Sequence, residues 1–592
     1  MRRMLVGGLA CIGGMVVLLI VIVLVLGGMA WSRKGVVPAQ TILELDLTRR
    51  LHEQPPNDPV SALLLARAPT VRDVVEALHR AATDDRVVAL IARIGASGLG
   101  LAQIQEVRDA VLAFRDKGKR AVAYAATFGE FDPGNGAYYL ATAFDTIYLQ
   151  PSGDVGLVGL MAEAPFLRGT LDKLALVPRL AQRQEYKTFM NTLTERQYTA
   201  AHREATQRVL ESQFAQIVQG IATARGLYAG AVRSLIDRGP FLGSEALQAQ
   251  FVDALAYRDE VYTQVKAQVG GQAQLLYLSK YLARAGRPYT SGDTIALIYG
   301  VGAIRLGESD FDPLLDGSTM GAETVTAAFR AAIEAPDVKA ILFRIDSPGG
   351  SYVASDAIWR ETVRAREAGK PLIVSMGDVA GSGGYFVAMA ANKIVAQPGT
   401  MTGSIGVLGG KLVTTGFWDK LGLSWDEIHT SANATMWSST QDYSPEQWAR
   451  LEGWLDRVYE DFTTKVAAGR QLAKERVLEV ARGRIWTGAD AKERGLVDEL
   501  GGLPVALRLT REAIGLPPDA PIRLQLFPAP PVLWEAVLDR LLGDEHESSE
   551  PSAATALLAR TLRLVRPVLH LAHTLGLTPR QDVLTMPDLR PR

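Results

Sequence analysis

The feature that most constrains this chain is an internal duplication centred on two glycine-rich turns. The sequence Val-Ala-Gly-Ser-Gly-Gly-Tyr at 379–385 has a degraded copy, Pro-Gly-Asn-Gly-Ala-Tyr, at 133–138. Ser382 is replaced by Asn135 in the first copy, 382 − 135 = 247 positions earlier. A duplicated chain that keeps a hydroxyl on a glycine turn in only one copy is typical of an enzyme whose halves have divided functions.

The duplication extends along most of the 592 residues. Each copy opens on an apolar stretch, at 41–46 and at 294–299, and reaches a second one at 87–94 and at 338–345 after an alanine-rich amphipathic segment. Short β-rich apolar runs that alternate with helical patterns predict parallel strands joined by crossover helices. We therefore expect an α/β fold made of two tandem repeats.

The composition along the chain predicts five segments. They are an N-terminal membrane anchor at 1–34, an N-terminal repeat at 41–269, a connector at 270–293, a C-terminal repeat at 294–515 and a helical extension at 516–592. The connector is inferred from its Gly, Gln and Ser content. The extension carries Arg560, Arg563 and Arg566 at helical spacing. These arginines form either a solvated helix face or a helix that contacts a membrane surface or another subunit.

The anchor is inferred from Met4–Trp31, which contains no charged residue. A helix of about 20 apolar residues crosses a bilayer. A cleavable signal peptide is the alternative, because Gly28-Met29-Ala30 resembles a cleavage site, but the apolar run is longer than signal peptides usually have. The slight excess of positive charge before the run favours a cytoplasmic N-terminus with the body across the membrane.

Charge and cysteine content exclude some classes of function. The net charge of −1 gives no indication of nucleic-acid binding. The single cysteine, Cys11, excludes an internal disulfide. We expect neither a metal nor a cofactor.

Ser382 has the surroundings that a serine nucleophile needs. Flanking glycines permit a sharp turn from strand to helix and leave backbone N–H groups, such as that of Gly383, available to a developing oxyanion. Gly349 and Gly350 follow the apolar stretch 338–345, and the C-terminal end of a parallel strand is well placed to supply a second donor. These three glycines are the predicted oxyanion or substrate contacts.

The residues alone do not identify the general base that would activate Ser382. None of the seven histidines lies in a triad motif; they are His52, His79, His202, His429, His546, His570 and His573. The Gly-x-Ser-x-Gly elbow also fails, because position 380 is alanine. A lysine serves as base if burial lowers its pKa from about 10.4 toward neutrality, but composition does not select which lysine.

Four motifs in order resemble the signal peptide peptidase A family, membrane-anchored Ser–Lys proteases, in its long tandem-repeat form. They are Asp-Ser-Pro-Gly-Gly at 346–350, Gly-Ser-Gly-Gly-Tyr at 381–385, Thr-Gly-Ser-Ile-Gly at 402–406 and Trp-Thr-Gly at 486–488. The resemblance covers residues from about 40 to 510 and implies a Clp-protease/crotonase-like fold.

The resemblance also implies the base. The family places its lysine in the N-terminal repeat, within a Tyr-Lys-Ser or Tyr-Lys-Thr motif, and Tyr186-Lys187-Thr188 matches it. The repeat counterpart of Lys187 is 187 + 247 = 434, which is Ala434. A further serine that hydrogen-bonds the lysine corresponds to Ser404. One complete pair, Ser382 and Lys187, is thus shared between the repeats.

We therefore expect a membrane-anchored serine endopeptidase that cuts apolar peptides such as cleaved signal peptides. The resemblance implies a homotetramer on the outer face of a bacterial inner membrane, in contact with lipid. One alternative is a crotonase-type acyl-CoA enzyme, which leaves Lys187 and the anchor unexplained. A second is an inactive membrane scaffold, against which the Ser382–Lys187 pair argues. His429 remains an alternative base, because it is the histidine nearest the lysine-equivalent segment of the second copy.

Overall fold

The computed structural model describes residues 35–55, 69–312, 317–528 and 584–586. The predicted anchor and most of the predicted helical extension lie outside these ranges. In the part of the chain that is described, no helix combines the length and apolar character needed to cross a membrane.

The N-terminal repeat is built on a parallel six-stranded sheet with the order β8-β4-β3-β2-β1-β9. Its strands are β1 (Thr41–Leu47), β2 (Val87–Ile94), β3 (Arg120–Ala125), β4 (Thr146–Leu149), β8 (Ala254–Leu255) and β9 (Gln274–Tyr277). The crossover helices are α3 (Val71–Ala82), α4 (Leu101–Arg115) and α5 (Asn135–Ala141). The central strands are nearly continuous runs of buried apolar residues, as expected for a parallel sheet covered on both faces.

The C-terminal repeat has an eight-stranded sheet. Its strands are β22 (Ile522–Phe527), β10 (Asp293–Val301), β14 (Val338–Ser347), β16 (Leu372–Gly381), β17 (Lys393–Ala396), β21 (Glu499–Leu500), β18 (Met401–Gly403) and β20 (Ile485–Thr487). The path β22-β10-β14-β16-β17-β21 repeats the strand order of the first sheet. Each sheet also has a register irregularity at the same place, between Thr41 and Ile42 and between Thr294 and Ile295. The body is therefore two copies of one unit.

The later helices repeat as well. α8 (Ala200–Arg225) and α17 (Pro445–Arg470) both have 26 residues and start 445 − 200 = 245 positions apart. The same offset relates α10 (Gly243–Gln248) to α19 (Gly488–Glu493), and α11 (Arg258–Gln268) to α20 (Leu503–Ala513). The other helices of the two repeats are α9 (Ala229–Ile236), α13 (Ala322–Glu334), α14 (Tyr352–Glu367), α15 (Gly383–Phe386) and α18 (Lys474–Val480).

Two predicted boundaries differ from the structure. The segment 270–293, predicted as a connector, contains β9 and α12 (Leu278–Ala285), and β9 pairs with β1 as an edge strand. The start of the predicted extension is β22, which pairs with β10 in the same way. Both edge strands are short and lie beside Gly- or Pro-containing stretches. The alternation of apolar and polar residues along them is therefore too brief to distinguish them from linkers in the sequence.

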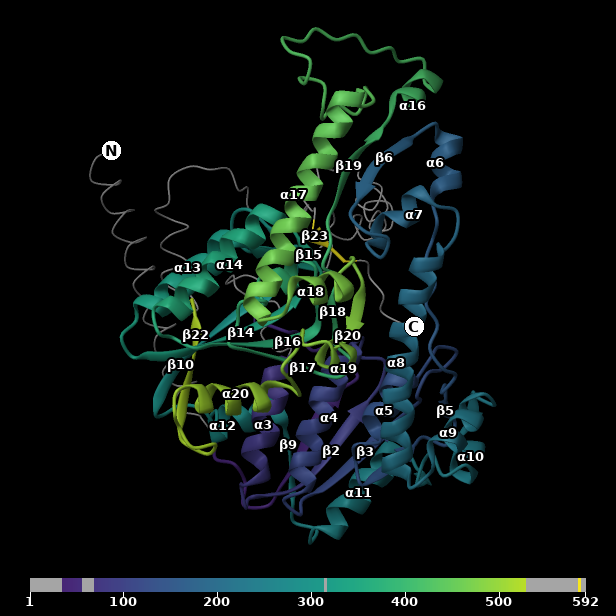
Figure 1. Ribbon diagram of the computed structural model, residues 1–592. Helices are drawn as coiled ribbons and strands as arrows, with labels where there is room; N and C mark the ends of the chain where they lie inside the picture. Colours follow the sequence, from purple (N-terminus) through teal and green to yellow (C-terminus); the bar gives the residue numbers. More distant parts are fainter. Residues whose placement is uncertain (1–34, 56–68, 313–316, 529–583, 587–592) are drawn as a thin grey trace, which may run out of the picture.

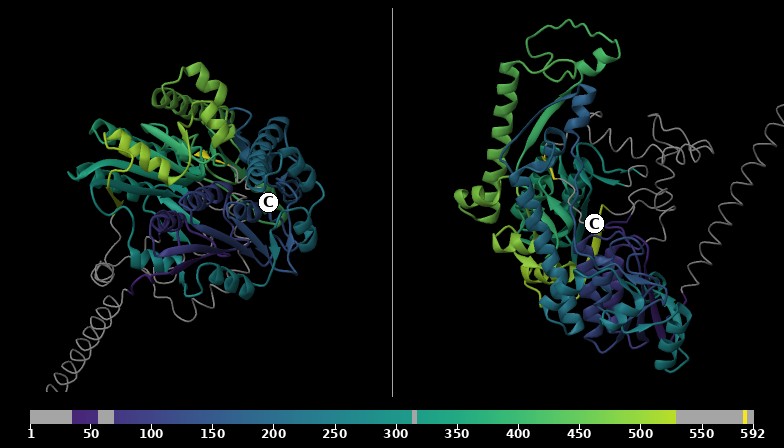
Figure 2. Two further views of the ribbon diagram at one scale, coloured as in Figure 1. Left: turned by 90° about the horizontal axis from the view of Figure 1, so that it is seen from below. Right: turned by 90° about the vertical axis from the view of Figure 1, so that its right-hand side faces the viewer.

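The repeats are joined by a small antiparallel sheet of β6 (Val177–Gln182) and β19 (Leu408–Val413). Around it lie α6 (Arg168–Leu174), the 3-10 helix η1 (Thr188–Met190), α7 (Asn191–Thr194) and α16 (Thr415–Lys420). Figure 1 shows β6 and β19 side by side above the two large sheets, and the right-hand view of Figure 2 shows α17 standing along this projection. One strand from each repeat thus fixes the two halves against each other.

Two smaller sheets complete the fold. β5 (Asp154–Val155) pairs with β7 (Phe241–Leu242), as β18 pairs with β20 in the second repeat. The other sheet has the order β12-β13-β11-β15-β23, made of β12 (Phe311–Asp312), β13 (Gly317–Gly321), β11 (Ala303–Arg305), β15 (Gly349–Gly350) and β23 (Leu584–Thr585).

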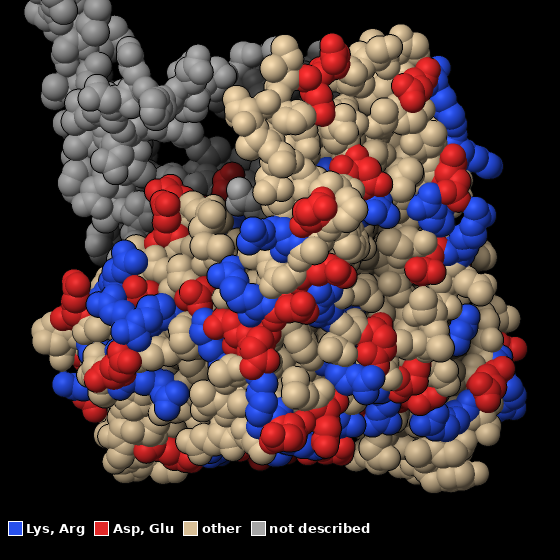
Figure 3. All heavy atoms as spheres, turned by 45° about the horizontal axis from the view of Figure 1, so that its top comes forward, with Lys and Arg blue, Asp and Glu red and all other residues tan. Residues whose placement is uncertain are grey.

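Acidic and basic side chains are interspersed over the face shown in Figure 3. Exposed large apolar side chains gather in the segment between α16 and α17. They are Leu421, Leu423, Trp425, Ile428 and Trp437. This segment lies at the top of the projection in Figure 1.

Candidate active site

Ser382 occupies the sharp strand-to-helix turn that was expected. β16 ends at Gly381, and Ser382 is the N-cap of α15 with φ 54° and ψ −114°. A non-glycine residue rarely adopts positive φ, and such strain is concentrated at functional sites. Its N–H donates to Gly403 O at 2.8 Å, which fixes the turn against β18.

Lys187 reaches Ser382 from the other repeat. Its Nζ lies 2.7 Å from Ser382 Oγ, 2.9 Å from Ser404 O and 3.0 Å from Ser404 Oγ. All three side chains are fully buried. Burial lowers the pKa of Lys187 well below its usual value, because an ammonium group loses hydration there. The structure thus brings together the three residues predicted from sequence as nucleophile, base and lysine partner.

A neutral amine can make all three contacts. A neutral Nζ carries two N–H donors and one lone pair. Two oxygens of Ser404 can accept the donors, and the lone pair then faces the hydroxyl of Ser382. The amine can therefore receive a proton from that hydroxyl without moving.

The β6–β19 sheet sets this geometry. Gln182 is opposite Leu408, and Arg183 donates its N–H to Val407 O at 2.9 Å. Lys187 stands 187 − 182 = 5 residues after the end of β6, and Ser404 stands 408 − 404 = 4 residues before the start of β19. Because the strands are antiparallel, both segments leave the sheet at the same end.

In the described residues of the first repeat, the position of Ser382 carries an asparagine that forms a different set of contacts. Asn135, at the position of Ser382, donates from Nδ2 to Gly159 O at 2.8 Å, and its Oδ1 accepts from Val158 N and Gly159 N at 3.1 Å each. Its side chain cross-links the loop that corresponds to the Ser404 loop. The lysine position is also lost in the second repeat, because the helix offset gives 187 + 245 = 432 and Ala432, like Ala434, is an exposed alanine.

The three predicted oxyanion glycines lie together beside Ser382. A Cβ added to Gly383 would lie 3.1 Å from both Gly349 Cα and Gly350 N. The N–H of Gly349 donates to Ser347 Oγ at 3.2 Å, so this donor is already engaged. Gly349 and Gly350 have φ of +99° and +156°, which favours glycine at both positions.

The prediction of His429 as an alternative base was wrong. His429 lies in the exposed segment between α16 and α17, where its Nδ1 is 3.7 Å from Glu427 Oε1. The segment that corresponds to the lysine loop projects outward in the second repeat, so this histidine is not brought to the buried Ser382.

Comparison with known proteins identifies the family. Residues 113–271 and 364–516, more than half of the chain, match the model of peptidase family S49. The chain belongs to this family. The chloroplastic serine protease SPPA of Arabidopsis thaliana is 31% identical over 75% of this chain and 66% of its own length. Protease 4 of Salmonella typhi is 31% identical over 83% of this chain and 79% of the relative.

A second bacterial relative has the same name. Protease 4 of Haemophilus influenzae is 30% identical over 76% of this chain and 74% of its own length. A solved ClpP1 mutant from Listeria monocytogenes matches 37% of this chain and 94% of its own, at 15% identity and a TM-score of 0.22. The protein is a serine peptidase, and neither a crotonase-type enzyme nor an inactive scaffold agrees with this membership.

A segment that sequence reasoning missed holds the lysine and Ser404 loops of this S49 peptidase together. Tyr186 N donates to Arg482 O at 3.2 Å, Gly483 N to Ile405 O at 2.7 Å, and Ser404 N to Arg484 O at 2.7 Å. Gly483 has φ of +79°, and a Cβ there would lie 2.5 Å from Lys187 N. Only glycine allows the backbone of Lys187 to approach so closely. The sequence signal was limited to one glycine between two arginines.

Gly483→Ala is expected to lower kcat/KM at least about 100-fold, because a displacement of about 1 Å in a catalytic group has an effect of this size. Gly369→Ala is the matched control, since Gly369 has φ of +74° but open space around its Cβ position. The two variants share the backbone strain and differ in the clash with Lys187. Steady-state kinetics on both checks the prediction, and an equal loss in both would contradict it.

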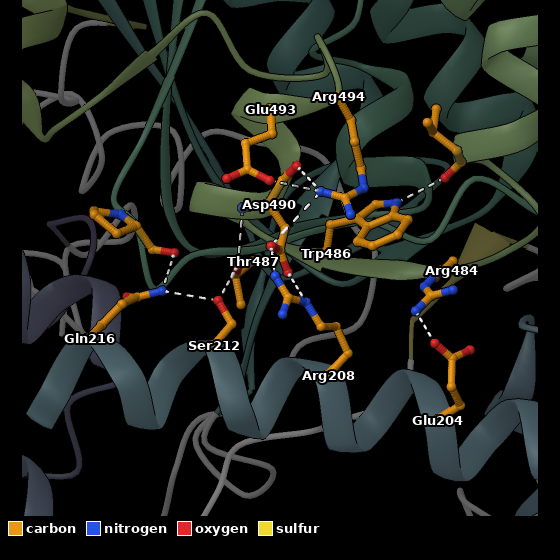
Figure 4. A network of polar contacts seen from close by, with 12 residues as sticks. Glu204, Arg208, Ser212, Gln216, Arg484, Trp486, Thr487, Asp490, Glu493 and Arg494 are labelled. Carbon is orange, nitrogen blue, oxygen red and sulfur yellow. Dashed lines mark hydrogen bonds and ion pairs between the residues drawn. The ribbon is translucent and has the colours of Figure 1, made fainter. Parts of the chain in front are cut away.

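A polar stripe on α8 fastens the helix that follows the lysine loop to the second repeat (Figure 4). The stripe is Glu204, Arg208, Ser212 and Gln216, at four-residue spacing on one helix face. Its partners, in order, are Arg484, Asp490, Thr487 and the carbonyl of Pro398. The Arg208 Nε–Asp490 Oδ2 distance is 3.1 Å, and the Ser212–Thr487 hydroxyls are 2.8 Å apart. The periodicity was visible in the sequence, but the partners were not.

The stripe also reaches the lysine loop. Glu204 forms a hydrogen bond with the side chain of Tyr186, which raises the pKa of the Tyr186 hydroxyl. The guanidinium of Arg484 lies 4.8 Å from the centre of the Tyr186 ring and 4.4 Å from that of Trp486. The residue before Lys187 is therefore held from both repeats.

Proposed function

We propose that this S49 peptidase is a membrane-anchored endopeptidase in which Ser382 is the nucleophile and Lys187 the general base. The observation that carries the proposal is the 2.7 Å contact between Lys187 Nζ and Ser382 Oγ, two fully buried groups from different repeats. Ser404 holds the amine through its carbonyl and hydroxyl oxygens and acts as a positioning residue.

The proposed reaction has two proton transfers in each half. The neutral amine of Lys187 takes the proton of Ser382 as Oγ bonds to the carbonyl carbon of the substrate. Backbone N–H groups of the Gly383 and Gly350 region stabilise the tetrahedral oxyanion. The resulting ammonium gives its proton to the leaving amine, and an acyl-enzyme remains. Water attacks this ester with Lys187 again as base, and the proton returns to Ser382.

The proposed substrates are apolar peptides such as cleaved signal peptides, in line with the four signal peptide peptidase motifs. The uncharged run Met4–Trp31 supports a single anchor in a bacterial inner membrane with the body on the periplasmic side. The exposed apolar segment between α16 and α17 suits contact with lipid or with another copy in the proposed homotetramer.

A serine-directed fluorophosphonate is expected to label the wild-type chain at one residue and to leave Ser382→Ala unlabelled. Only a serine with a base in contact is nucleophilic enough to react at neutral pH. Ser244→Ala is the control, because Ser244 is an exposed serine on α10. Mass spectrometry of labelled peptides checks the site, and persistent labelling of Ser382→Ala at another serine would refute the assignment.

A further inference from the structure

The edge of the first sheet carries a pocket that the proposed reaction does not use. It has a volume of about 600 Å³ and lies between β1, β9 and the start of α11. Its lining residues are Glu44, Arg258, Asp259, Tyr262, Leu275 and Tyr277. Figure 1 shows β9 and α11 at the end of the molecule away from the projection that carries β6 and β19. The lining residues are thus separate from the segments that hold Ser382 and Lys187.

The duplication shows how the same place in the fold is filled when it is packed as core. The strand registers and the helix offset of 245 place five of the lining residues at positions of leucines in the second repeat. All five leucines belong to one apolar cluster, and four of them are at most 7% exposed. The correspondences are Glu44 with Leu297, Arg258 with Leu503, Tyr262 with Leu507, Leu275 with Leu524, and Tyr277 with Leu526. Where the second repeat has packed leucines, the first repeat therefore has a carboxylate, a guanidinium and two phenols around an open space.

Glu44 is the buried polar group of this pocket, with a side chain that is only 4% exposed. The hydroxyl of Tyr262 donates to Glu44 Oε1 at 2.7 Å, and Arg258 Nη2 donates to the same oxygen at 3.0 Å. Burial and the carboxylate of Glu44 raise the pKa of Tyr262, so its hydroxyl stays a donor. Among the described residues no donor contacts Glu44 Oε2. A carboxylate accepts through both of its oxygens, so Oε2 is available to a ligand in the pocket.

The surroundings of this oxygen favour a cation. Two carboxylates and one guanidinium give the lining a net charge of 1 − 2 = −1. Both tyrosine rings already have a cation of the chain near them: Arg258 Cζ is 5.0 Å from the centre of the Tyr262 ring, and Lys280 Nζ is 5.9 Å from that of Tyr277. The face of a tyrosine ring attracts ammonium and guanidinium groups electrostatically. A ligand with an N–H donor and a positive charge therefore matches the pocket.

We propose that this pocket binds an ammonium or guanidinium group carried on an alkyl chain. One N–H of the ligand donates to Glu44 Oε2, and the alkyl chain packs against Leu275 and Tyr277. These two side chains are 48% and 46% exposed on β9, an edge strand that pairs only with β1 among the described strands. The ligand therefore enters from the open edge of the sheet. Arginine and lysine side chains of a peptide have this chemistry, and so do free amines.

Binding is measured by isothermal titration calorimetry on the full-length Ser382→Ala protein, which does not consume a peptide. Acetyl-Leu-Arg-Leu-amide is expected to bind at least about ten-fold tighter than the same peptide with citrulline, which keeps the shape of arginine and lacks its charge. Agmatine, titrated in the same way, separates the two sources of the cation. Tighter binding of the peptide assigns the pocket to a basic side chain, and tighter binding of agmatine assigns it to a free amine. Equal affinity for the arginine and citrulline peptides, or no binding of either cation, would overturn the proposal.

Two changes in the pocket locate the binding. Glu44→Gln is expected to weaken the arginine peptide at least about ten-fold. Glu479→Gln is the matched control, because Glu479 pairs with Arg476 at 2.8 Å on the exposed face of α18 in the other repeat. Glu44→Leu combined with Arg258→Leu copies the second repeat and removes one charge of each sign. It is expected to abolish binding, while the same double change in a chain with Ser382 leaves kcat unchanged and shows that the protein is folded. Equal affinity of the Glu44→Gln and Glu479→Gln proteins would place the cation elsewhere and refute the pocket.

Discussion

Replacing Lys187 with alanine is expected to lower kcat by about four orders of magnitude or more, the size of effect seen when a base of a nucleophilic pair is removed. Lys187→Arg is expected to fail equally, because a guanidinium stays protonated and cannot accept a proton from Ser382. The aliphatic stem of Lys187 is closely packed, since a Cβ on Gly406 would lie 3.1 Å from Lys187 Cδ. Single-turnover kinetics on both variants measures the effect.

The pH dependence follows from the burial of the same amine. Because the pKa of Lys187 is lowered, kcat/KM of the wild type is expected to rise with pH through that lowered value and then level off. A lysine in the unfolded chain has a pKa of about 10.4. Between the lowered pKa and about 10.4 the unfolded state binds one more proton, so stability rises with pH in this window.

Lys187→Met removes this titration and supplies the control. The free energy of unfolding of the wild type, relative to Lys187→Met, is expected to increase from pH 7 to pH 10, as measured by urea unfolding. This readout reports the buried amine even in a protein without turnover. Near-normal turnover of Lys187→Arg, or a pH-independent difference in stability, would contradict the assignment of Lys187 as a buried base.

The pairing of Ser382 with Lys187 could be predicted because the duplication left each group in one copy only. The motif match selected Lys187, and the loss of its counterpart explained why the repeats must meet. The strands and crossover helices could also be predicted, since the runs at 87–94 and 338–345 are apolar throughout. Strand order was not encoded in any local pattern.

What could not be predicted depends on contacts between distant segments. The requirement for glycine at position 483 comes from the backbone of Lys187, which lies 483 − 187 = 296 positions away in the sequence. The burial of Met586 depends on its contacts with Gly381, β18 and β20. Nothing in the sequence Leu-Thr-Met indicates a strand. The oxyanion glycines were predicted as a group, but the engagement of Gly349 N–H by Ser347 is a local detail of the turn.

A buried ion cluster between the repeats was also missed. Arg344 on β14 is 4% exposed and contacts Glu53 and Glu106 of the N-terminal repeat; its Nη2 donates to Glu106 Oε2 at 2.8 Å. Burial alone would lower the pKa of Arg344, but Glu106 and Glu53 raise it well above its usual value. Glu106 Oε1 also accepts from Leu503 N at 2.7 Å, so the cluster ties both repeats to the start of α20.

Arg344→Met is expected to destabilise the protein by about 3–5 kcal/mol, because it leaves two glutamates buried without a cation. The duplication supplies the control. Arg93 occupies the equivalent position on β2, and its Nη1 lies 3.3 Å from Asp46 Oδ2 in a pair that is partly exposed. Arg93→Met is therefore expected to change stability by about 1 kcal/mol or less.

A third variant separates loss of the charge balance from loss of packing. Arg344→Met combined with Glu53→Gln and Glu106→Gln removes all three charges, and it is expected to recover part of the stability lost in Arg344→Met, since buried ion clusters replaced as a unit are often tolerated. Urea unfolding followed by tryptophan fluorescence measures all three proteins. Equal effects of Arg344→Met and Arg93→Met would show that the cluster does not hold the repeats together. Because Ser382 and Lys187 come from different repeats, a loosened cluster is also expected to lower kcat while Arg93→Met leaves it unchanged.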